Sequence, residues 1–546
     1  MITPTEEQIN IIEESNNCVV IAKPGSGKTF ILSEKIRNII PELPMYKGVI
    51  AISFTNKASN ELKQRCLSDG LFPKESFFGT IDRFFISEII IPFGIQIFGL
   101  PAHDIKITSI RDLDHADKNN FSWLKDDFFY PDLRSNHIEL LKSNFNSGII
   151  YIETIGLLSL YIFDNSKACQ KYIKARYSHV IIDEYQDSGM EQHELFLRLQ
   201  EMGLISIAVG DADQSIYAFA GKNSKYLLSL PKNKKFKFLS LTYNHRSHPS
   251  IINYSSVLLR QDFELLNYDR INIFEKQVVG DETKIANWID RAVPFYLSKF
   301  DIKRNKEVAV LARNNRTAGI IDDNLQLNHK LFLQTNLDVD INKHSVLFRN
   351  LLICALDQQQ TKYNLLDSLI DINDNKIKTK SVYLKIQEIE RLICDFNNLL
   401  VNKNKIINIS KKICEEVFGQ QANIKSLELL EEVINDKRLV ESYRPAKNNE
   451  IQIMTLHKSK GLEFDLVFHL DLYEYIMPSE SFKENGQRCF NDYEQDINLH
   501  YVGITRAKKC CILTISTQRN NFRKELKVAN KSIFFNINNL EKLRIS

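Results

Sequence analysis

Two short segments combine residue types that handle phosphate groups and divalent metal ions. The first is Ala22-Lys23-Pro24-Gly25-Ser26-Gly27-Lys28-Thr29, which follows an apolar run and precedes a helix-forming stretch. Glycines let backbone N–H groups close around phosphate oxygens at a helix N-terminus, which already attracts anions. In such a loop Lys28 reaches the β and γ phosphates, and the Thr29 hydroxyl binds Mg²⁺. The segment therefore predicts an ATP site, although Ala22 stands where the pattern usually begins with glycine.

The second segment is Asp183-Glu184-Tyr185-Gln186-Asp187, directly after the apolar run Val180-Ile181-Ile182. A carboxylate at the end of a strand beside a phosphate loop can hold Mg²⁺, which is the role predicted for Asp183. The next carboxylate can accept a proton from the attacking water, which is the role predicted for Glu184. The alternative is an acidic cap on a following helix. The phosphate loop upstream favours the catalytic interpretation.

Buried parallel strands must position both segments. Short runs rich in Val and Ile alternate with helix-forming stretches, and this alternation is typical of a doubly wound α/β fold. The runs expected to form a first sheet are Cys18–Ala22, Gly48–Phe54, His179–Ile182 and Ile205–Val209. Those expected to form a second sheet are Glu307–Ala312, Ile451–Leu456, Leu466–Leu470 and Cys510–Ser516.

Two stretches interrupt this alternation and predict one insertion in each α/β domain. Residues 100–165 are mixed, polar and aromatic, and residues 320–445 are mostly helical by period. Apolar residues at three-four spacing between Ile386 and Leu400 predict one amphipathic helix. The domain boundaries that follow are 1–99, 100–165, 166–245, 246–320, 321–445 and 446–546.

Composition limits the function classes only weakly. The 546 residues carry a formal net charge of +3, so any DNA-binding surface must come from local clusters of Lys and Arg. The nine cysteines form no CxxC pair, and most lie in apolar runs, which predicts reduced thiols and no zinc site. The N-terminus has no signal-peptide character, and no apolar run approaches the ~20 residues of a membrane span. We expect a cytoplasmic protein that does not contact membranes.

The two phosphate-handling segments and seven further motifs resemble those of superfamily 1 helicases related to UvrD, Rep and PcrA. Individually some are weak, but their common order from residue 5 to residue 507 is specific. The further motifs are Thr5-Glu6-Glu7-Gln8, Ser53–Ala58, Gly79–Asp82, Val209–Tyr217, Tyr243–Ser247, Thr455–Phe464 and Tyr501–Ala507. The resemblance implies two RecA-like doubly wound parallel-sheet domains, each with a mainly helical insertion.

The resemblance also implies roles in the nucleotide site. Arg246 and Arg506 resemble the two arginine fingers of the family, and positive charge on the transferring phosphoryl group is what the reaction needs. Gln214 resembles the γ-phosphate sensor and Glu463 the residue that reaches the nucleotide from the second domain. Gln8 is the expected contact to adenine. His245 replaces the Tyr common at the position that stacks on adenine.

Single-strand DNA binding combines phosphate contacts with stacking on aromatic side chains. By their place in the motifs, three aromatic residues are expected to touch bases, and four others are expected to hydrogen-bond phosphates. These are Phe54, Tyr217 and Phe219 for the bases, and Thr55, Thr80, Thr455 and His457 for the phosphates. Arg313 follows a predicted strand and is expected to add a charge. Core packing is the alternative for both Phe residues.

Two features separate the chain from full-length repair helicases of this type. Phe219-Ala220-Gly221 stands where many relatives have Trp-Arg-Gly, so a cation that links the DNA track to the ATP site is missing. The insertions are also short, and the stretch Phe77–Gly94 is similar to the helicase-like subunit of the Gabija anti-phage defence system.

That resemblance implies a hetero-oligomeric partner, a nuclease with an ATPase and a Toprim domain. The alternatives are a stand-alone repair helicase and a switch subunit that binds nucleic acid and regulates a partner without translocating.

Overall fold

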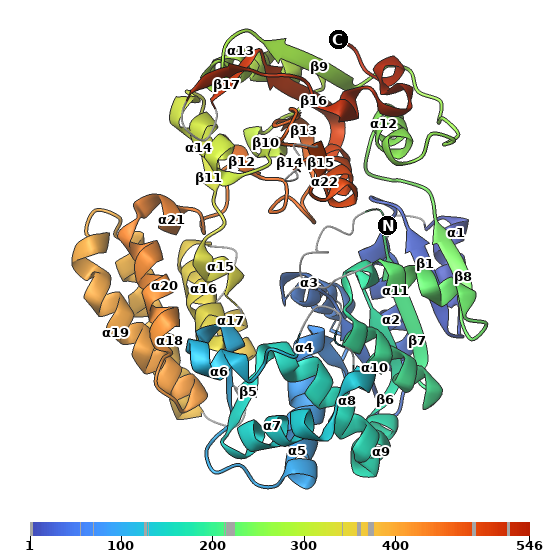
Figure 1. Ribbon diagram of the computed structural model, residues 1–546, viewed down its shortest axis with the longest axis vertical. Coiled ribbons are helices and arrows are strands. Elements are labelled where there is room, and N and C mark those ends of the chain that lie inside the picture. Colours follow the sequence, from blue (N-terminus) through green and yellow to red (C-terminus); the bar gives the residue numbers. More distant parts are fainter. Residues whose placement is uncertain are drawn as a thin grey trace. The chain divides into compact units, whose positions relative to one another are not determined.

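The computed structural model describes residues 4–54, 56–68, 70–124, 128, 130–211, 213, 224–340, 342–357, 362–369, 376–482, 488–520 and 525–546. The chain divides into two compact units, Met1–Ser247 and His248–Ser546. Each unit contains one large sheet with flanking helices (Figure 1).

The first unit is built on a six-stranded, wholly parallel sheet with strand order β3-β2-β6-β7-β1-β8. Alternate residues of the central strands enter two separate apolar cores, one on each face of the sheet. This burial on both faces is why the strands read as continuous apolar runs. The strands are β1 (Cys18–Ala22), β2 (Gly48–Ile52), β3 (Phe77–Gly79), β6 (Tyr177–Ile182), β7 (Ile205–Gly210) and β8 (Lys237–Leu241). The flanking helices are α1 (Glu6–Glu13), α2 (Lys28–Glu42), α3 (Asn56–Leu67), α10 (Met190–Glu201) and α11 (Lys225–Ser229).

The first unit also has a mainly helical part. Phe84 and Phe85 share one apolar core with Phe145 and Leu158, and this core also contains residues of the sheet. The helical part also holds a short parallel pair, β4 (Lys106–Thr108) and β5 (Ile149–Tyr151). Its helices are α4 (Ile81–Phe84), α5 (Ile91–Phe98), α6 (His115–Asn119), α7 (Ser135–Asn146), α8 (Ile155–Asn165) and α9 (Lys167–Arg176).

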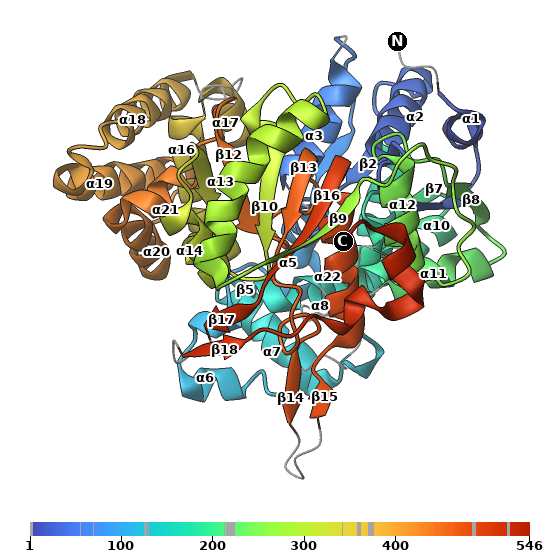
Figure 2. The ribbon, with the colours of Figure 1, turned by 90° about the horizontal axis from the view of Figure 1, so that it is seen from above.

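The second unit also has a six-stranded parallel sheet, with strand order β11-β12-β10-β13-β16-β9. Figure 2 shows β13, β16 and β9 side by side. The strands are β9 (Ile273–Val278), β10 (Val308–Ala312), β11 (His329–Phe332), β12 (Ile451–Thr455), β13 (Phe464–His469) and β16 (Ala507–Ser516). The flanking helices are α12 (Pro249–Leu259), α13 (Glu282–Lys299), α14 (Asn315–Asn324) and α22 (Tyr493–Thr505). Two antiparallel pairs are β14 (Glu480–Phe482) with β15 (Arg488–Phe490), and β17 (Gln518–Asn520) with β18 (Leu526–Val528).

The helical segment of the second unit differs from expectation in two places. β11 lies inside the range 321–445 and pairs with β12, because a four-residue edge strand is too short to show its own period. The predicted single helix from Ile386 to Leu400 is two helices, since α18 ends at Cys394 and α19 begins at Leu399. Leu400 is 64% exposed. The helices are α15 (Asn336–Val339), α16 (Lys343–Leu356), α17 (Lys362–Leu369), α18 (Lys376–Cys394), α19 (Leu399–Phe418), α20 (Ile424–Asn435) and α21 (Lys437–Glu441).

The predicted fold class is confirmed: two parallel, doubly wound α/β sheets with helical segments inserted. The nine cysteines, all among the described residues, are free thiols. No described helix combines the length and the apolar character that crossing a membrane requires.

Candidate nucleotide site and nucleic-acid interface

The phosphate loop connects the end of β1 to the start of α2, as predicted. Gly25 and Gly27 have φ values of 70° and 86°, a left-handed conformation that strongly favours glycine. Gly25 is also required by space, because an added Cβ would lie 2.5 Å from both Arg246 Cβ and Asn244 Oδ1. Pro24 and Ser26 are buried, and the Ser26 hydroxyl donates to the Lys23 carbonyl (2.7 Å). These contacts fix the conformation of the loop at the N-terminus of α2, whose first two residues are Lys28 and Thr29.

Gln8 connects the phosphate loop to α1. Its carbonyl oxygen accepts from the Thr5 N–H (3.0 Å), and its amide nitrogen donates to the Ser26 carbonyl (3.0 Å) and lies 3.3 Å from His245 Nε2. Gln8 is only 3% exposed. The expected adenine contact is therefore placed beside the loop, but its amide is engaged by the protein. A contact to the base requires it to exchange one of these partners.

The segment after β8 folds over the phosphate loop. The His245 N–H donates to the Gly25 carbonyl (2.9 Å), and Asn244 Oδ1 accepts from the N–H groups of Arg246 (2.7 Å) and Ser247 (3.0 Å). The exposed ring of Tyr243 meets the ring of His245 edge to face at 4.6 Å. Arg246 is thereby positioned beside the loop within the first unit. The predicted stacking residue His245 thus has a second ring, that of Tyr243, beside it.

The acidic pair lies at the end of β6, next to β2 in the sheet. Asp183 is 7% exposed, and its N–H donates to the Ile52 carbonyl (2.9 Å). Burial and the adjacent Glu184 carboxylate raise the pKa of Asp183, while the positive charge of Lys28 opposes that rise. Glu184 has a left-handed backbone (φ 53°, ψ 42°), and Asp183 Oδ1 accepts its N–H (2.9 Å). The predicted phosphate and metal ligands, which are 155 positions apart, are therefore electrostatic neighbours.

Gln186 belongs to the site and was not predicted. Its side chain is completely buried, its amide nitrogen donates to Glu184 Oε2, and its carbonyl oxygen accepts from the Asp211 N–H (2.9 Å). It thus holds the carboxylate of Glu184 against the end of β7. Gly210 makes room for this contact, because a Cβ there would lie 2.5 Å from Gln186 Oε1. No sequence signal separates this glutamine from the other polar residues of its motif.

Lys23 forms an ion pair with Asp213, with Nζ 2.5 Å from Oδ2. This contact joins the phosphate loop to the segment after β7. The predicted γ-phosphate sensor Gln214 and the predicted DNA contacts Tyr217 and Phe219 follow in that segment and lie outside the described residues, as does Thr55.

The donor set at the loop fits a magnesium ion. Mg²⁺ prefers hard oxygen ligands and is usually bound by one or two carboxylates together with substrate phosphates. The Asp183 carboxylate supplies such an oxygen at the end of β6, and the Thr29 hydroxyl sits in the first turn of α2. The raised pKa of Asp183 indicates that its negative charge is incompletely compensated, and a bound cation removes that deficit.

The predicted DNA contacts of the first unit follow neighbouring strands. β2 pairs with β3, and the Ser53 N–H donates to the Gly79 carbonyl (3.1 Å), so Phe54 and Thr80 leave the sheet at the same edge. Phe54 is half-buried. Thr80 begins α4, and its hydroxyl accepts from the Arg83 N–H (3.4 Å).

The predicted DNA contacts of the second unit also come together. Arg313 follows β10 and Thr455 ends β12, two strands that pair Ala312 with Thr455. Burial, and next the charge of Arg313, lower the pKa of His457 to about 4, so this imidazole is neutral at pH 7. Thr455 is 6% exposed, and its hydroxyl accepts from the Lys458 N–H (3.3 Å).

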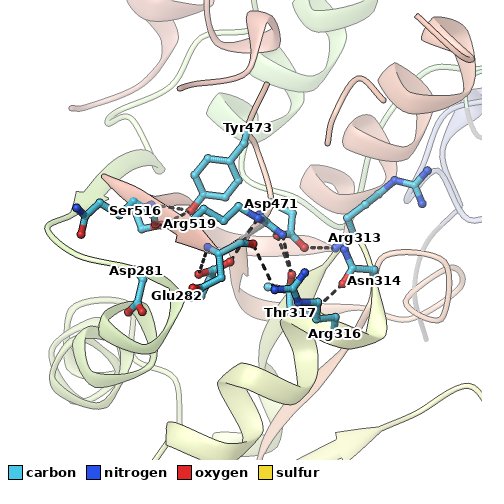
Figure 3. Close-up of polar contacts among 12 residues, drawn as sticks. Asp281, Glu282, Arg313, Asn314, Arg316, Thr317, Asp471, Tyr473, Ser516 and Arg519 are labelled. Atoms are coloured by element: carbon cyan, nitrogen blue, oxygen red, sulfur yellow. Dashed lines mark hydrogen bonds and ion pairs between the residues drawn. The ribbon is translucent and has the colours of Figure 1, made fainter. Parts of the chain in front are cut away.

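Arg313 stands at the border of a buried ionic network that sequence reasoning missed (Figure 3). Asp471, 1% exposed, accepts from the Arg313 N–H (2.8 Å), the Thr317 hydroxyl (3.0 Å) and Arg519 Nη1 (2.6 Å). Arg519 also pairs with Glu282 (3.4 Å) and covers the ring of Tyr473. Such a network fixes the backbone of Arg313, while its guanidinium points away from Asp471 (Figure 3).

The second predicted arginine finger, Arg506, is buried and makes its hydrogen bonds within the second unit. Arg506 is 1% exposed, and it donates to the carbonyls of Val502 (3.1 Å) and Leu462 (3.2 Å) and to the Thr505 hydroxyl (3.3 Å). The exposed Glu463 follows Leu462 directly, so the two residues expected to reach the nucleotide lie next to each other. A finger role requires Arg506 to leave these internal acceptors.

Comparison with known proteins covers almost the whole chain. Residues 5–220 match the AAA domain family, and residues 333–520 match the UvrD-like helicase C-terminal domain family. The Gabija protein GajB of Bacillus cereus is 28% identical and aligns over 95% of this chain and 98% of its own. The ATP-dependent DNA helicase Rep of Buchnera aphidicola is 24% identical over 97% and 96%. The ATP-dependent DNA helicase PcrA of Staphylococcus aureus is 21% identical over 95% and 84%.

The matched ranges include the phosphate loop, the acidic pair and the segments at the ends of β12 and α22. Two parallel α/β sheets with helical insertions carry these segments in the predicted order. The chain belongs to the UvrD-like superfamily 1 family of ATP-dependent DNA helicases.

Proposed function

We propose that this chain hydrolyses ATP in a DNA-stimulated reaction and uses it to move along or separate DNA. The observation that carries the proposal is the convergence of three distant segments at one edge of the first sheet. The phosphate loop, the acidic pair after β6 and the Arg246 segment after β8 all meet there. Phosphoryl transfer needs little beyond positioning and charge stabilisation, and these segments supply both.

Each residue has a definite task in this proposal. Lys28 and the loop N–H groups hold the phosphates, and Asp183 with Thr29 holds Mg²⁺, which neutralises charge on the phosphate oxygens. Glu184, kept in place by Gln186, accepts the proton of the attacking water. Arg246 and Arg506 stabilise charge on the transferring group, and Gln8, Tyr243 and His245 form the surface for the base. Glu463 and Gln214 complete the nucleotide contacts.

DNA binding rests on the same kind of convergence in each unit. Phe54 and Thr80 share one edge in the first unit, and Arg313, Thr455 and His457 share one edge in the second. These side chains combine a ring for stacking, hydroxyls and an imidazole for phosphate oxygens, and one fixed positive charge. Thr55, Tyr217 and Phe219 are proposed to extend this track.

The test is ATP hydrolysis with and without single-stranded DNA. We expect Lys28→Ala to abolish hydrolysis, because the phosphates lose their principal cation. Lys167→Ala is a matched control, since Lys167 is an exposed lysine at the start of α9 and should leave the rate at the wild-type value. Hydrolysis at the wild-type rate by Lys28→Ala, or a wild-type rate that DNA does not raise, would contradict the proposal.

We further propose that the chain is the helicase-like component of a Gabija-type antiviral complex with a nuclease partner. The support is the match to GajB across nearly the full length of both chains, at 28% identity. The measurement is co-purification from the native gene cluster, followed by a DNA-cleavage assay of the complex with and without ATP. A neighbouring Toprim nuclease that binds and responds to ATP supports the role. A chain that purifies alone and displaces strands by itself favours a repair helicase.

A non-translocating switch subunit is the second candidate, favoured by Ala220 in place of a cation in the segment after β7. The two functions differ in their need for turnover. If Glu184→Gln still permits nuclease activation, nucleotide binding alone is the signal. If activation is lost together with hydrolysis, the motor interpretation holds.

A further inference from the structure

We propose that Asp496 is a positioning residue that couples DNA binding at Arg313 to the position of Arg506. The inference rests on the proposed function, because it uses Arg313 as a DNA contact and Arg506 as an arginine finger. All of its residues lie in the second unit. The link is α22, which carries Asp496 in its first turn and ends at Thr505, directly before Arg506.

Asp496 is built into the structure as an acceptor. It is 1% exposed, and one carboxylate oxygen accepts from Arg313 Nη2 (3.1 Å). The other oxygen accepts from the N–H (2.7 Å) and the hydroxyl (2.8 Å) of Ser479. Because this buried carboxylate accepts from three donors, removal of either the carboxylate or Arg313 would leave a buried group without its partner, which costs free energy. Arg313 is therefore a fixed partner of α22 rather than a solvated surface arginine.

The backbone of Arg313 is fixed, whereas its guanidinium can exchange one hydrogen-bond partner for another. Its backbone N–H is held by Asp471, which Arg519 and Thr317 hold in turn. Its side chain is 27% exposed and leads away from that network (Figure 3). Its Nη2 donates to Asp496 Oδ1 (3.1 Å). A DNA phosphate that approaches Arg313 competes with Asp496 for the same guanidinium, because both are anions that prefer its planar donors.

α22 is suited to transmit the outcome of that competition. Asp496 and Arg506 are ten positions apart, about 15 Å along a helix axis. Between them Leu499, Val502 and Ile504 are completely buried, so the helix moves as a body if it moves. Arg506 donates to the carbonyls of Val502 in α22 and of Leu462 outside it. A shift of α22 therefore changes the position of the Val502 carbonyl relative to the Leu462 carbonyl. This alters the hydrogen bonds that position Arg506.

This route would couple DNA binding to the ATP site without a cation at position 220. The family resemblance implies that an arginine at the position of Ala220 would join the DNA track to the ATP site. Here the position is an alanine. The Arg313–Asp496 pair provides a second connection, from the ends of β10 and β12 to the last residue before β16.

The test is the ratio of ATP turnover at saturating single-stranded DNA to turnover without DNA. Asp496→Asn keeps the shape and an acceptor for Ser479 but removes the charge that holds Arg313. We expect the ratio to fall about tenfold, within the range typical of coupling between sites. Glu275→Gln is the matched control, because Glu275 is also a buried carboxylate in the second unit, paired with Arg544 (2.6 Å) and Lys531. The control should leave the ratio unchanged.

Two further variants separate coupling from a structural defect. Asp496→Glu restores the charge and should recover the ratio to within about twofold of wild type. In the Arg313→Ala background, Asp496→Asn should lower the ratio no further, because the pair is already broken. A multiplicative loss in the double variant, or equal losses for Asn and Glu, would overturn the inference.

If Asp496→Asn does not fold, Arg313→Ala alone decides. The inference requires a lower ratio at saturating DNA, whereas a mere phosphate contact changes only the DNA concentration needed for half-saturation. The proposed function fails separately, if DNA does not stimulate the wild-type chain. If DNA stimulates the wild type and Asp496→Asn equally, the inference alone is wrong.

Discussion

The carboxyl-terminal edges of the two sheets have the same architecture, but the buried acid at each edge has different partners. In the first unit this edge carries the phosphate loop after β1 and Asp183 after β6, whose burial without a paired arginine raises its pKa. In the second unit a buried acid, Asp471 after β13, is neutralised by Arg519 and accepts a hydrogen bond from the Thr317 hydroxyl. Both acids are buried, but Asp471 has an arginine partner, whereas burial and the carboxylate of Glu184 raise the pKa of Asp183.

This difference shows that the parallel sheet provides a position for a ligand site at its strand ends but does not determine whether a ligand binds there. In doubly wound folds the strand ends form a crevice where ligands bind. Whether that crevice binds a ligand depends on which side chains fill it. Here the second edge is filled with an ionic network, and the partly exposed guanidinium of Arg313 faces away from that network (Figure 3). The predictions below test this division between chemistry and structure.

The largest expected effect is on turnover in the first unit. Glu184→Gln should lower kcat for ATP hydrolysis by about a hundredfold to ten-thousandfold, because the amide cannot accept the proton from water. Nucleotide binding and the thermal midpoint should stay near wild type. Steady-state hydrolysis and a fluorescent-nucleotide binding assay check the two parts. Normal turnover in this variant would remove Glu184 from the role of base.

The second prediction concerns the second edge. Asp471→Asn should lower the free energy of unfolding by about 3 kcal/mol, because it takes a charged partner from the buried Arg519. The matching change Asp183→Asn should cost little stability and should abolish hydrolysis. The measurement is chemical denaturation of each variant, followed by a signal from the unit that carries the substitution. Equal stability losses in the two variants would erase the proposed difference between the edges.

A smaller effect is expected from backbone space. Gly25→Ala places a methyl group 2.5 Å from Arg246 Cβ in a left-handed conformation, so the phosphate loop must move. Strain of about 1–2 kcal/mol corresponds to roughly tenfold weaker nucleotide binding. Gly419→Ala is the control, because Gly419 is also left-handed (φ 67°) but has no atom within 4 Å of its Cβ position. It should weaken folding slightly and leave nucleotide affinity intact, as calorimetry can show.

The smallest expected effect is a pH dependence of the second unit. Burial lowers the pKa of His469 to about 4 and also lowers that of its neighbour His500, whose Nδ1 lies 3.0 Å from His469 Nε2. The folded state therefore favours neutral rings, and stability is lost as the pH falls below about 6.5, the ordinary pKa of histidine. The thermal midpoint should drop from pH 7 to pH 5, and the drop should be smaller in His500→Gln. An identical drop in both proteins would exclude His500 as a cause.

Most of the nucleotide site could be predicted because its chemistry is local. The glycines, Lys28 and Thr29 are contiguous, and Asp183 with Glu184 follows a recognisable apolar strand. The contacts of Gln186 with Asp211 and of Asp496 with Arg313 could not be predicted, because these partners are 25 and 183 positions apart in the sequence. The break between α18 and α19 was missed because apolar spacing continues across it.

The sequence by itself determined the two parallel sheets, the phosphate loop and the acidic pair. Strand periodicity, turn glycines and ligand types all depend on residues that are neighbours in the chain. Only the tertiary structure decided which buried acids are neutralised internally, that Arg506 is held by backbone carbonyls and that Arg313 is tied to α22. The physical reason is that charge compensation depends on distance in space, and the sequence records only distance along the chain.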